Sequence, residues 1–234
     1  MPNAVITGAT HGIGKAIAQK FLSKGWNVAI CARNQTELNA LNKEWKLQFP
    51  DVNSYCFKAD FSKKEEVKTF SDFVMKTFSD IDVLVNNAGI FVPGNITDEP
   101  ENQLEYLMTV NVYSAYHLTR LLLPKMTANK SGHIFNMCSV ASMKAYDNGG
   151  AYSITKYALL GFSENLRNEL MAQNIKVTSF MPGATWSRSW IGSNQNENRL
   201  MKAEDLAEMV WTCTQLSHQA NVESVVMRPL EGDI

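Results

Sequence analysis

The 234-residue sequence has no apolar run approaching the roughly 20 residues that a membrane-spanning helix needs. Its opening residues, 1–7, are too few and too uncharged for a secretory signal. A strong net charge is also lacking, because 22 basic residues face 23 acidic ones and leave a formal charge of −1. This balance argues against a nucleic acid or a membrane surface as partner. We expect a cytoplasmic protein.

Cysteines are few and scattered. Cys31, Cys56, Cys138 and Cys213 lie far apart, without Cys-x-x-Cys or histidine spacing. The pattern therefore indicates neither a disulfide framework nor a metal site, and we expect buried thiols in a reducing compartment. Repeats, low-complexity tracts and linkers are absent as well. The length suits one α/β domain that spans residues 1–234.

Short apolar runs alternate with segments of helical periodicity along the whole chain. Because the apolar runs are unbroken, they predict parallel strands that are buried on both faces. The sequence thus predicts an α/β fold of Rossmann type, a doubly wound parallel sheet with helices on both faces. The strands are expected at 4–6, 27–31, 54–57, 83–85, 133–138, 176–180 and 222–227.

The helical segments carry boundary signals. A capping box from Ser62 to Glu65 predicts the start of the third helix. A long helix is expected between Pro100 and Pro124. The helix that contains Tyr152 is expected to run to about residue 172, and a last helix covers about 203–216.

Glycines, asparagines and a serine collect after successive strands, where the carboxyl ends of parallel strands form the ligand site. A G-x-x-x-G-x-G loop follows the first strand and suits the close approach of a pyrophosphate. Its spacing differs from the G-x-G-x-x-G fingerprint, so an ordinary Gly-rich turn explains it about equally well. The loop's candidate binding residues are Gly8, Thr10, His11, Gly12, Ile13 and Gly14.

Two further polar residues have a local and a functional interpretation. Asp60, after the third strand, either accepts from an adenine amino group or is an N-capping or solvated residue. Asn111, a poor helix former flanked by valines, is either a core amide satisfied locally or part of a buried polar site.

Tyr152 and Lys156 are four residues apart and share one helix face. We expect the lysine ammonium to lower the pKa of the phenol from its usual value of about 10. Ser139, just past the fifth strand, is placed to hydrogen-bond the same substrate oxygen. Taken alone, the pair is weak evidence, because two such residues also share a helix face by chance.

With these motifs together, the chain is identified as resembling the short-chain dehydrogenase/reductase family. The resemblance covers nearly the whole chain and implies an NAD(P)(H)-dependent hydride transfer to or from a carbonyl. It implies that Tyr152 is the general acid/base, Ser139 orients the carbonyl and Lys156 lowers the tyrosine pKa and holds the ribose. Asn111 would steady a proton-relay water. Cofactor contacts are further implied at Asn87, Ala88, Gly89, Pro182, Gly183, Thr185 and Ser187, where Ser187 stands in place of the family's usual threonine.

The end of the second strand predicts which cofactor is used. NAD enzymes of this architecture carry an acidic residue there, but this chain has Ala32 followed by Arg33. A guanidinium suits the 2′-phosphate of NADP(H), and the alternative is a surface arginine. His11 is a second candidate donor or else a solvated loop residue.

The substrate stays open. The tail resembles NADP-dependent 3-hydroxy-acid dehydrogenases, and also 3-oxoacyl-carrier-protein and sepiapterin-type reductases. Residues 184–203 are expected to form a substrate lid in which Trp186, Arg188, Trp190 and Arg199 either contact the substrate or pack the loop. Phe91, Val92, Met143 and Tyr146 are other candidate walls.

Apolar residues surround most of the helix at 101–123, so a homodimer or homotetramer is expected through it and the 152–172 helix. The rival to an enzyme is a cofactor-binding regulatory protein that has lost turnover.

Overall fold

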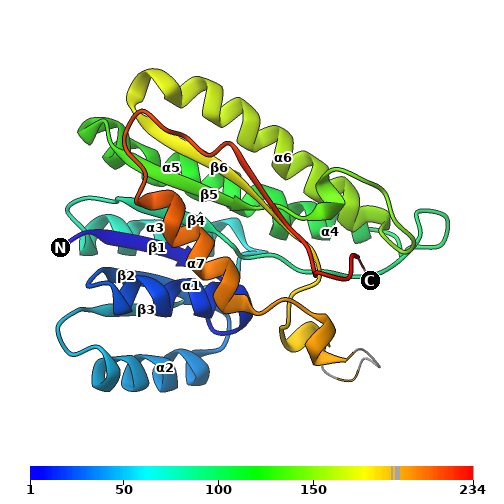
Figure 1. Ribbon diagram of the computed structural model, residues 1–234, viewed down its shortest axis with the longest axis horizontal. Coiled ribbons are helices and arrows are strands. Elements are labelled where there is room, and N and C mark those ends of the chain that lie inside the picture. Colours follow the sequence, from blue (N-terminus) through cyan, green and yellow to red (C-terminus); the bar gives the residue numbers. More distant parts are fainter. Residues whose placement is uncertain (191, 193–195, 234) are drawn as a thin grey trace.

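Each of the seven apolar runs forms a strand in the computed structural model, which describes residues 1–190, 192 and 196–233. All seven strands are parallel and lie in one sheet in the order β3-β2-β1-β4-β5-β6-β7 (Figure 1). Their bounds are β1 Asn3–Thr7, β2 Asn27–Ala32, β3 Ser54–Lys58, β4 Val83–Asn86, β5 Gly132–Met137, β6 Ile175–Pro182 and β7 Ser224–Met227. The predicted Rossmann-type sheet is confirmed.

The central strand β1 fixes where a ligand can bind. All five of its residues are buried, and it pairs with β2 on one side and β4 on the other. From β1 the chain therefore adds β2 and β3 on one side of the sheet and β4 to β7 on the other. Loops that leave β1 and β4 at their carboxyl ends diverge there, and ligands of doubly wound sheets bind in that crevice.

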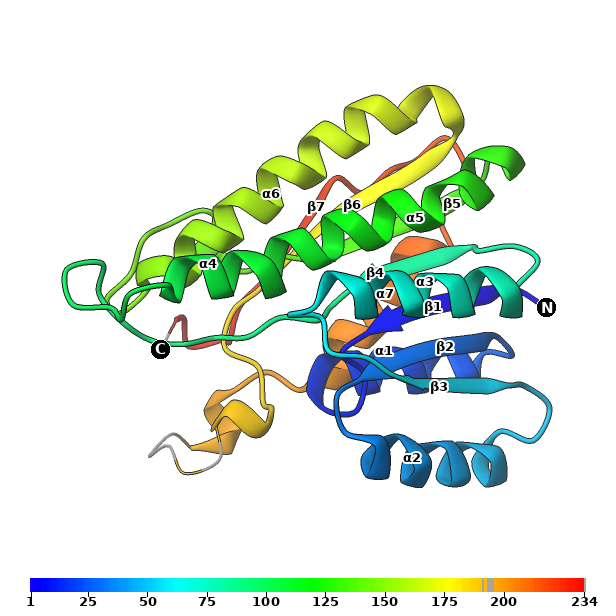
Figure 2. The same cartoon turned by 180° about the vertical axis from the view of Figure 1, so that it is seen from behind.

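Helices cover both faces of the sheet. One face carries α1 (Gly12–Ser23), α2 (Gln35–Gln48) and α7 (Ala203–Thr214), whose apolar side chains pack with Ala4 and Ile6 of β1. The other carries α3 (Lys64–Thr77), α5 (Ser114–Asn129) and α6 (Gly150–Leu170), which pack with Val5. The short α4 (Gln103–Met108) precedes α5 on that second face (Figure 2).

Two helix boundaries differ from the sequence prediction. The capping box at Ser62–Glu65 is wrong: α3 begins at Lys64, and Asp60 binds the Ser62 backbone and hydroxyl at 3.0 and 2.9 Å instead. The end at Pro124 is also wrong, since α5 continues through it to Asn129. A proline removes only one N–H donor from a helix. The carbonyl that loses this partner belongs to Arg120, which is exposed and can bind water.

Three of the four cysteines are buried and Cys56 is half-buried. Within the described residues, no helix combines the length and the apolar character needed to cross a membrane.

His133 at the start of β5 is buried among the strands. Its Nε2 lies 2.7 Å from Thr178 Oγ1, and its ring stacks on Phe135 at a centroid distance of 4.0 Å. Burial lowers the pKa of His133 to about 3, with the nearby Lys176 charge adding to the effect. The folded protein therefore holds this side chain neutral at pH values where the unfolded chain would protonate it.

We predict that stability falls as the pH drops from about 6.5 toward 3. In that window the unfolded chain binds a proton that folded His133 does not, so acid favours unfolding by up to about 4 kcal/mol. Urea unfolding at several pH values should show a shallower loss for His133→Gln. His218 is exposed, so His218→Gln is the control, and its stability should depend on pH as in the wild type. The same dependence of stability on pH in all three proteins would contradict the prediction.

Candidate active site

A cavity of about 1410 Å³ lies at the carboxyl ends of the central strands. Every residue that the sequence analysis named for catalysis or cofactor binding lines it, except Asn111. The glycine loop contributes Gly8 and Thr10–Gly14, β2 ends there with Arg33, and α6 supplies Tyr152 and Lys156. Predicted residues from Gly8 to Ser187 thus share one site.

The glycine loop is held by side chains from both central strands. Asn87 Nδ2 donates to the carbonyls of Thr7 and Gly8 at 2.9 and 3.0 Å. In return, Thr7 Oγ1 accepts from the N–H groups of Asn87 and Ala88 at 3.0 and 2.8 Å. These bonds lock the ends of β1 and β4 together and fix the floor of the cavity.

Gly14 shows why the loop must lack side chains. A Cβ at this position would lie 2.4 Å from Asn87 Nδ2 and 2.6 Å from the Gly8 carbonyl oxygen, far inside van der Waals contact. Gly8 and Gly12 adopt φ of +63° and +51°, which favour glycine. Helix α1 follows with no acidic residue in its first turn and no side-chain cap from any described residue. The loop is therefore a bare, positively polarised cradle that suits a pyrophosphate.

Asp60 and Arg33 face the far end of the same cavity. Burial tends to raise the pKa of Asp60, but hydrogen bonds from the Ser62 N–H and hydroxyl and the charge of Arg33 hold that pKa below its usual value. The carboxylate is thus anionic, and its Oδ1 accepts the two hydrogen bonds from Ser62. Asp60 orders the turn before α3 through its bonds to Ser62 and also lines the cavity, so its contact with an adenine stays a prediction.

Ser139, Tyr152 and Lys156 converge at the inner end of the cavity. Ser139 Oγ accepts from the Ala141 N–H at 3.1 Å in a short 3₁₀ turn over Val140–Ser142, which holds the hydroxyl where it hydrogen-bonds the Tyr152 side chain. Lys156 Nζ donates to the Met137 carbonyl at 2.8 Å and lies 5.6 Å from the Tyr152 ring centroid. The Phe91 ring meets Tyr152 edge to face at 4.9 Å.

The pKa values of this group differ from expectation. Burial raises the pKa of Tyr152 to about 12, and only the Ser139 hydrogen bond opposes it. Burial also lowers the pKa of Lys156 to about 8. The predicted lowering of the Tyr152 pKa by Lys156 is therefore not found in this geometry. The reason is that desolvation disfavours both charged forms, and the ammonium points to the Met137 carbonyl.

Asn111 is buried behind the cavity in a π-helical turn, Thr109–Tyr113, between α4 and α5. Its Oδ1 accepts from the Ile90 N–H at 2.8 Å. Its Nδ2 donates to the Ile90 carbonyl at 3.0 Å and to Thr155 Oγ1 at 3.1 Å. The amide joins the loop after β4 to α6, so the local interpretation of Asn111 describes its contacts.

The segment 184–203 folds back on itself beside the glycine loop, and residues 191 and 193–195 of it lie outside the described part of the chain. Its two ends pair through the Trp186 N–H to the Met201 carbonyl at 2.9 Å and the Met201 N–H to the Ala184 carbonyl at 3.1 Å. Ser187 packs against Gly12 of the glycine loop. A Cβ added at Gly12 would lie only 3.1 Å from Ser187 Cβ.

Of the four residues named in this segment, Arg188 and Trp190 line the main cavity. Trp186 lines a second, smaller one, and Arg199 pairs with Glu231 at 3.1 Å instead. Phe91 and Tyr146 are found among the cavity walls, whereas Val92 and Met143 are not in its described lining.

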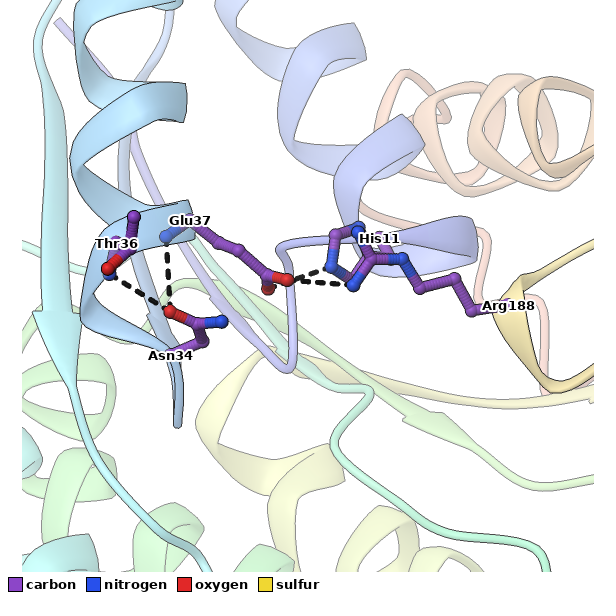
Figure 3. Close-up of polar contacts among 5 residues, drawn as sticks. All are labelled: His11, Asn34, Thr36, Glu37 and Arg188. Atoms are coloured by element: carbon purple, nitrogen blue, oxygen red, sulfur yellow. Dashed lines mark hydrogen bonds and ion pairs between the residues drawn. The ribbon is translucent and has the colours of Figure 1, made fainter.

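Glu37 is a charged cavity residue that the sequence did not predict. Glu37 Oε2 lies 2.8 Å from His11 Nε2, and its Oε1 lies 2.7 Å from Arg188 Nη1 (Figure 3). The His11 side chain is thus not simply solvated, and its Nε2 is paired with Glu37 instead of facing a phosphate site. Glu37 stands four residues after Arg33, so the sequence places an acidic residue near the predicted phosphate site, but it does not show the contacts with His11 and Arg188.

Comparisons with known proteins agree with this geometry. A family model described as short chain dehydrogenase matches residues 2–198. An uncharacterized oxidoreductase of Staphylococcus epidermidis is 32% identical over 228 residues, 97% of this chain and 96% of that protein. An alcohol dehydrogenase from Thermococcus sibiricus with 5-hydroxy-NADP matches with TM-score 0.91 and 26% identity over 100% of this chain and 99% of that one. The closed form of a serine dehydrogenase with NADP⁺ matches with TM-score 0.87 and 26% identity, covering 99% and 96%.

We predict that Asn111→Ala loosens the loop after β4. The variant leaves the Ile90 N–H and carbonyl without their partner, and unpaired buried groups of this kind cost about 1–3 kcal/mol. Hydrogen exchange should accelerate at the Ile90 amide, with a parallel loss in urea unfolding. The exposed Asn95→Ala in the same loop is the control. Unchanged exchange at Ile90 would show that the amide does not hold the loop.

Proposed function

The chain belongs to the short-chain dehydrogenase family, and on that premise we propose that it is an NADP(H)-dependent oxidoreductase acting on a carbonyl and its secondary alcohol. The observation that carries the proposal is the convergence of Ser139, Tyr152 and Lys156 in the cavity that the glycine loop floors. A proton donor and a pyrophosphate cradle in one cavity are what a hydride-transfer site requires.

The residues present fit the dinucleotide. The bare cradle at Gly12–Gly14 receives the pyrophosphate, and Asp60 accepts from the adenine. Arg33 is the cation for the 2′-phosphate. Lys156 holds the nicotinamide ribose, with Asn87–Gly89 beside it. Pro182, Gly183 and Thr185 line the cavity at the end of β6 and would face the nicotinamide, while Ser187 lies beside Gly12 of the cradle. When bound, the cofactor supplies or accepts the hydride.

Tyr152 is the proton donor to the carbonyl oxygen. With its pKa raised to about 12, the phenol carries its proton throughout the neutral range, which suits the reduction direction. Ser139 holds the carbonyl oxygen by the hydroxyl that already hydrogen-bonds Tyr152. Oxidation of an alcohol needs the phenolate, so we infer that alkaline pH favours that direction.

The substrate class follows from the walls. Phe91, Tyr146 and Trp190 give an apolar border, and Lys144 places a cationic side chain on the same cavity. Arg228 adds a second cation, which is ion-paired to Asp233 of the lining. A 3-oxo or 3-hydroxy acid or acyl group has an apolar part and an anionic end, and it matches this combination. We propose this class, and the residues 184–203 as the lid over it.

We predict that Tyr152→Phe lowers the rate of carbonyl reduction by roughly 10²–10⁴-fold, since it removes the proton donor. NADPH binding should change little, because the phenol hydroxyl donates its proton to the substrate and is not a main contact of the cofactor. NADPH oxidation would be followed with β-keto esters, diketones and acyl thioesters. Tyr157→Phe, exposed on the same helix, is the control. A variant retaining more than about a tenth of the rate would exclude Tyr152 as the acid.

The proposed oligomer concerns one exposed face. Leu104, Tyr116 and Leu121 of α4 and α5 are exposed, as are Ile154 and Tyr157 of α6. The two helices adjoin, because the rings of Tyr116 and Phe162 meet at 5.6 Å. Large exposed apolar side chains on adjacent helices mark an association surface.

We predict a dimer or tetramer that buries this face. Light scattering at micromolar concentration should give a multiple of 26.2 kDa. Tyr157→Glu should shift the mass toward the monomer, because a charge in an apolar interface is costly. Leu47→Glu, on exposed α2 surface, is the matched control. A wild-type monomer would refute the proposal.

A further inference from the structure

Glu37 joins three segments that are remote in the sequence. It stands in the first turn of α2, where Asn34 caps the helix by accepting from the Thr36 and Glu37 N–H groups at 3.0 and 3.3 Å. Its carboxylate binds His11 of the glycine loop on one oxygen and Arg188 of the segment after β6 on the other (Figure 3). All three side chains line the main cavity, together with Arg33.

The carboxylate is anionic at neutral pH. The hydrogen bond from Arg188 is the largest reason why the pKa of Glu37 lies below its usual value, and His11 adds to it. The exposed fractions are 26% for the Glu37 side chain and 60% for Arg188. An arginine so exposed keeps the freedom to change partners.

The position of this carboxylate conflicts with the cofactor at first sight. The adenosine ribose of a dinucleotide lies past the end of the second strand, and here Arg33 and Glu37 both face that region. A 2′-phosphate carries about −1.5 to −2 charges and three acceptor oxygens. Within a Debye length of about 8 Å, the carboxylate repels it.

We propose that Glu37 holds the place of the 2′-phosphate, and that Arg188 leaves Glu37 to bind the phosphate beside Arg33. Arg188 is then a specificity-determining residue for NADPH, and Glu37 is an internal competitor that weakens the preference. The inference rests on the proposed NADP(H) assignment.

The charges and geometry favour this exchange. An arginine binds phosphate through two parallel N–H donors as readily as it binds a carboxylate, and the phosphate has the larger charge. In NADH no such group exists, so Arg188 stays with Glu37 and neither side chain affects the affinity. A purely structural tether would instead act on both cofactors alike.

The test compares the dissociation constants of NADPH and NADH by calorimetry. Arg188→Gln should lower the NADPH-over-NADH preference by roughly tenfold, the loss of one charge-assisted hydrogen bond. Glu37→Gln should raise the preference by about two- to fivefold, because it removes the competing anion from a partly exposed site. Both shifts should shrink at high salt. Glu44→Gln is the matched control on α2, where Glu44 pairs with Lys15 at 3.8 Å.

The outcomes separate this inference from the proposed function. Equal changes for both cofactors, or a weaker NADPH preference in Glu37→Gln, would overturn the exchange. A preference that falls only in Arg33→Ala would keep the NADP(H) assignment and refute the role of Arg188. A wild-type protein that binds neither cofactor would overturn both.

Discussion

The hydrogen bond from Lys156 to the Met137 carbonyl is the contact on which the site depends. At 2.8 Å it fastens α6 to the end of β5. Ser139 lies two residues past that carbonyl, and Tyr152 lies one helical turn before the lysine. One buried bond therefore brings together a strand end and a helix face. Burying the ammonium for this bond removes it from water, and because desolvation disfavours the charged form, the pKa of Lys156 falls to about 8.

Desolvation sets the character of the site more than pairwise attraction does. The same burial that lowers the lysine pKa raises that of Tyr152 to about 12. The pair is thus arranged to keep a phenol protonated, which is the state that donates to a carbonyl. At the outer end of the cavity the opposite holds, because Glu37, Arg188 and Arg33 are exposed enough to stay charged. The proposed proton donation and the proposed phosphate recognition thus fall in regions of different solvation.

Much of the fold could be predicted because each strand is an unbroken apolar run, and the polar residues after strands pointed to one edge of the sheet. The capping box failed because Asp60 offered the Ser62 backbone a nearer acceptor. Periodicity could not show the π turn that carries Asn111, nor the bonds of its side chain to Ile90 and Thr155. Nor could spacing reveal that Glu37 meets Arg188, 151 residues away. Contacts set by tertiary packing, and the pKa values that burial imposes, leave no local signal.

Deuteride transfer from [4,4-²H₂]NADPH tests the central claim most directly, since it follows the hydride itself whichever C4 hydrogen is transferred. A carbonyl compound that the protein accepts should yield an alcohol with one deuterium on the carbinol carbon, with one NADPH oxidised per alcohol formed. Mass spectrometry of the alcohol measures its deuterium content and amount, and the absorbance of NADPH measures how much cofactor is oxidised. NADPH that binds with defined stoichiometry but transfers no deuterium to any β-keto ester, diketone or acyl thioester would contradict an oxidoreductase and identify a cofactor-binding protein without turnover.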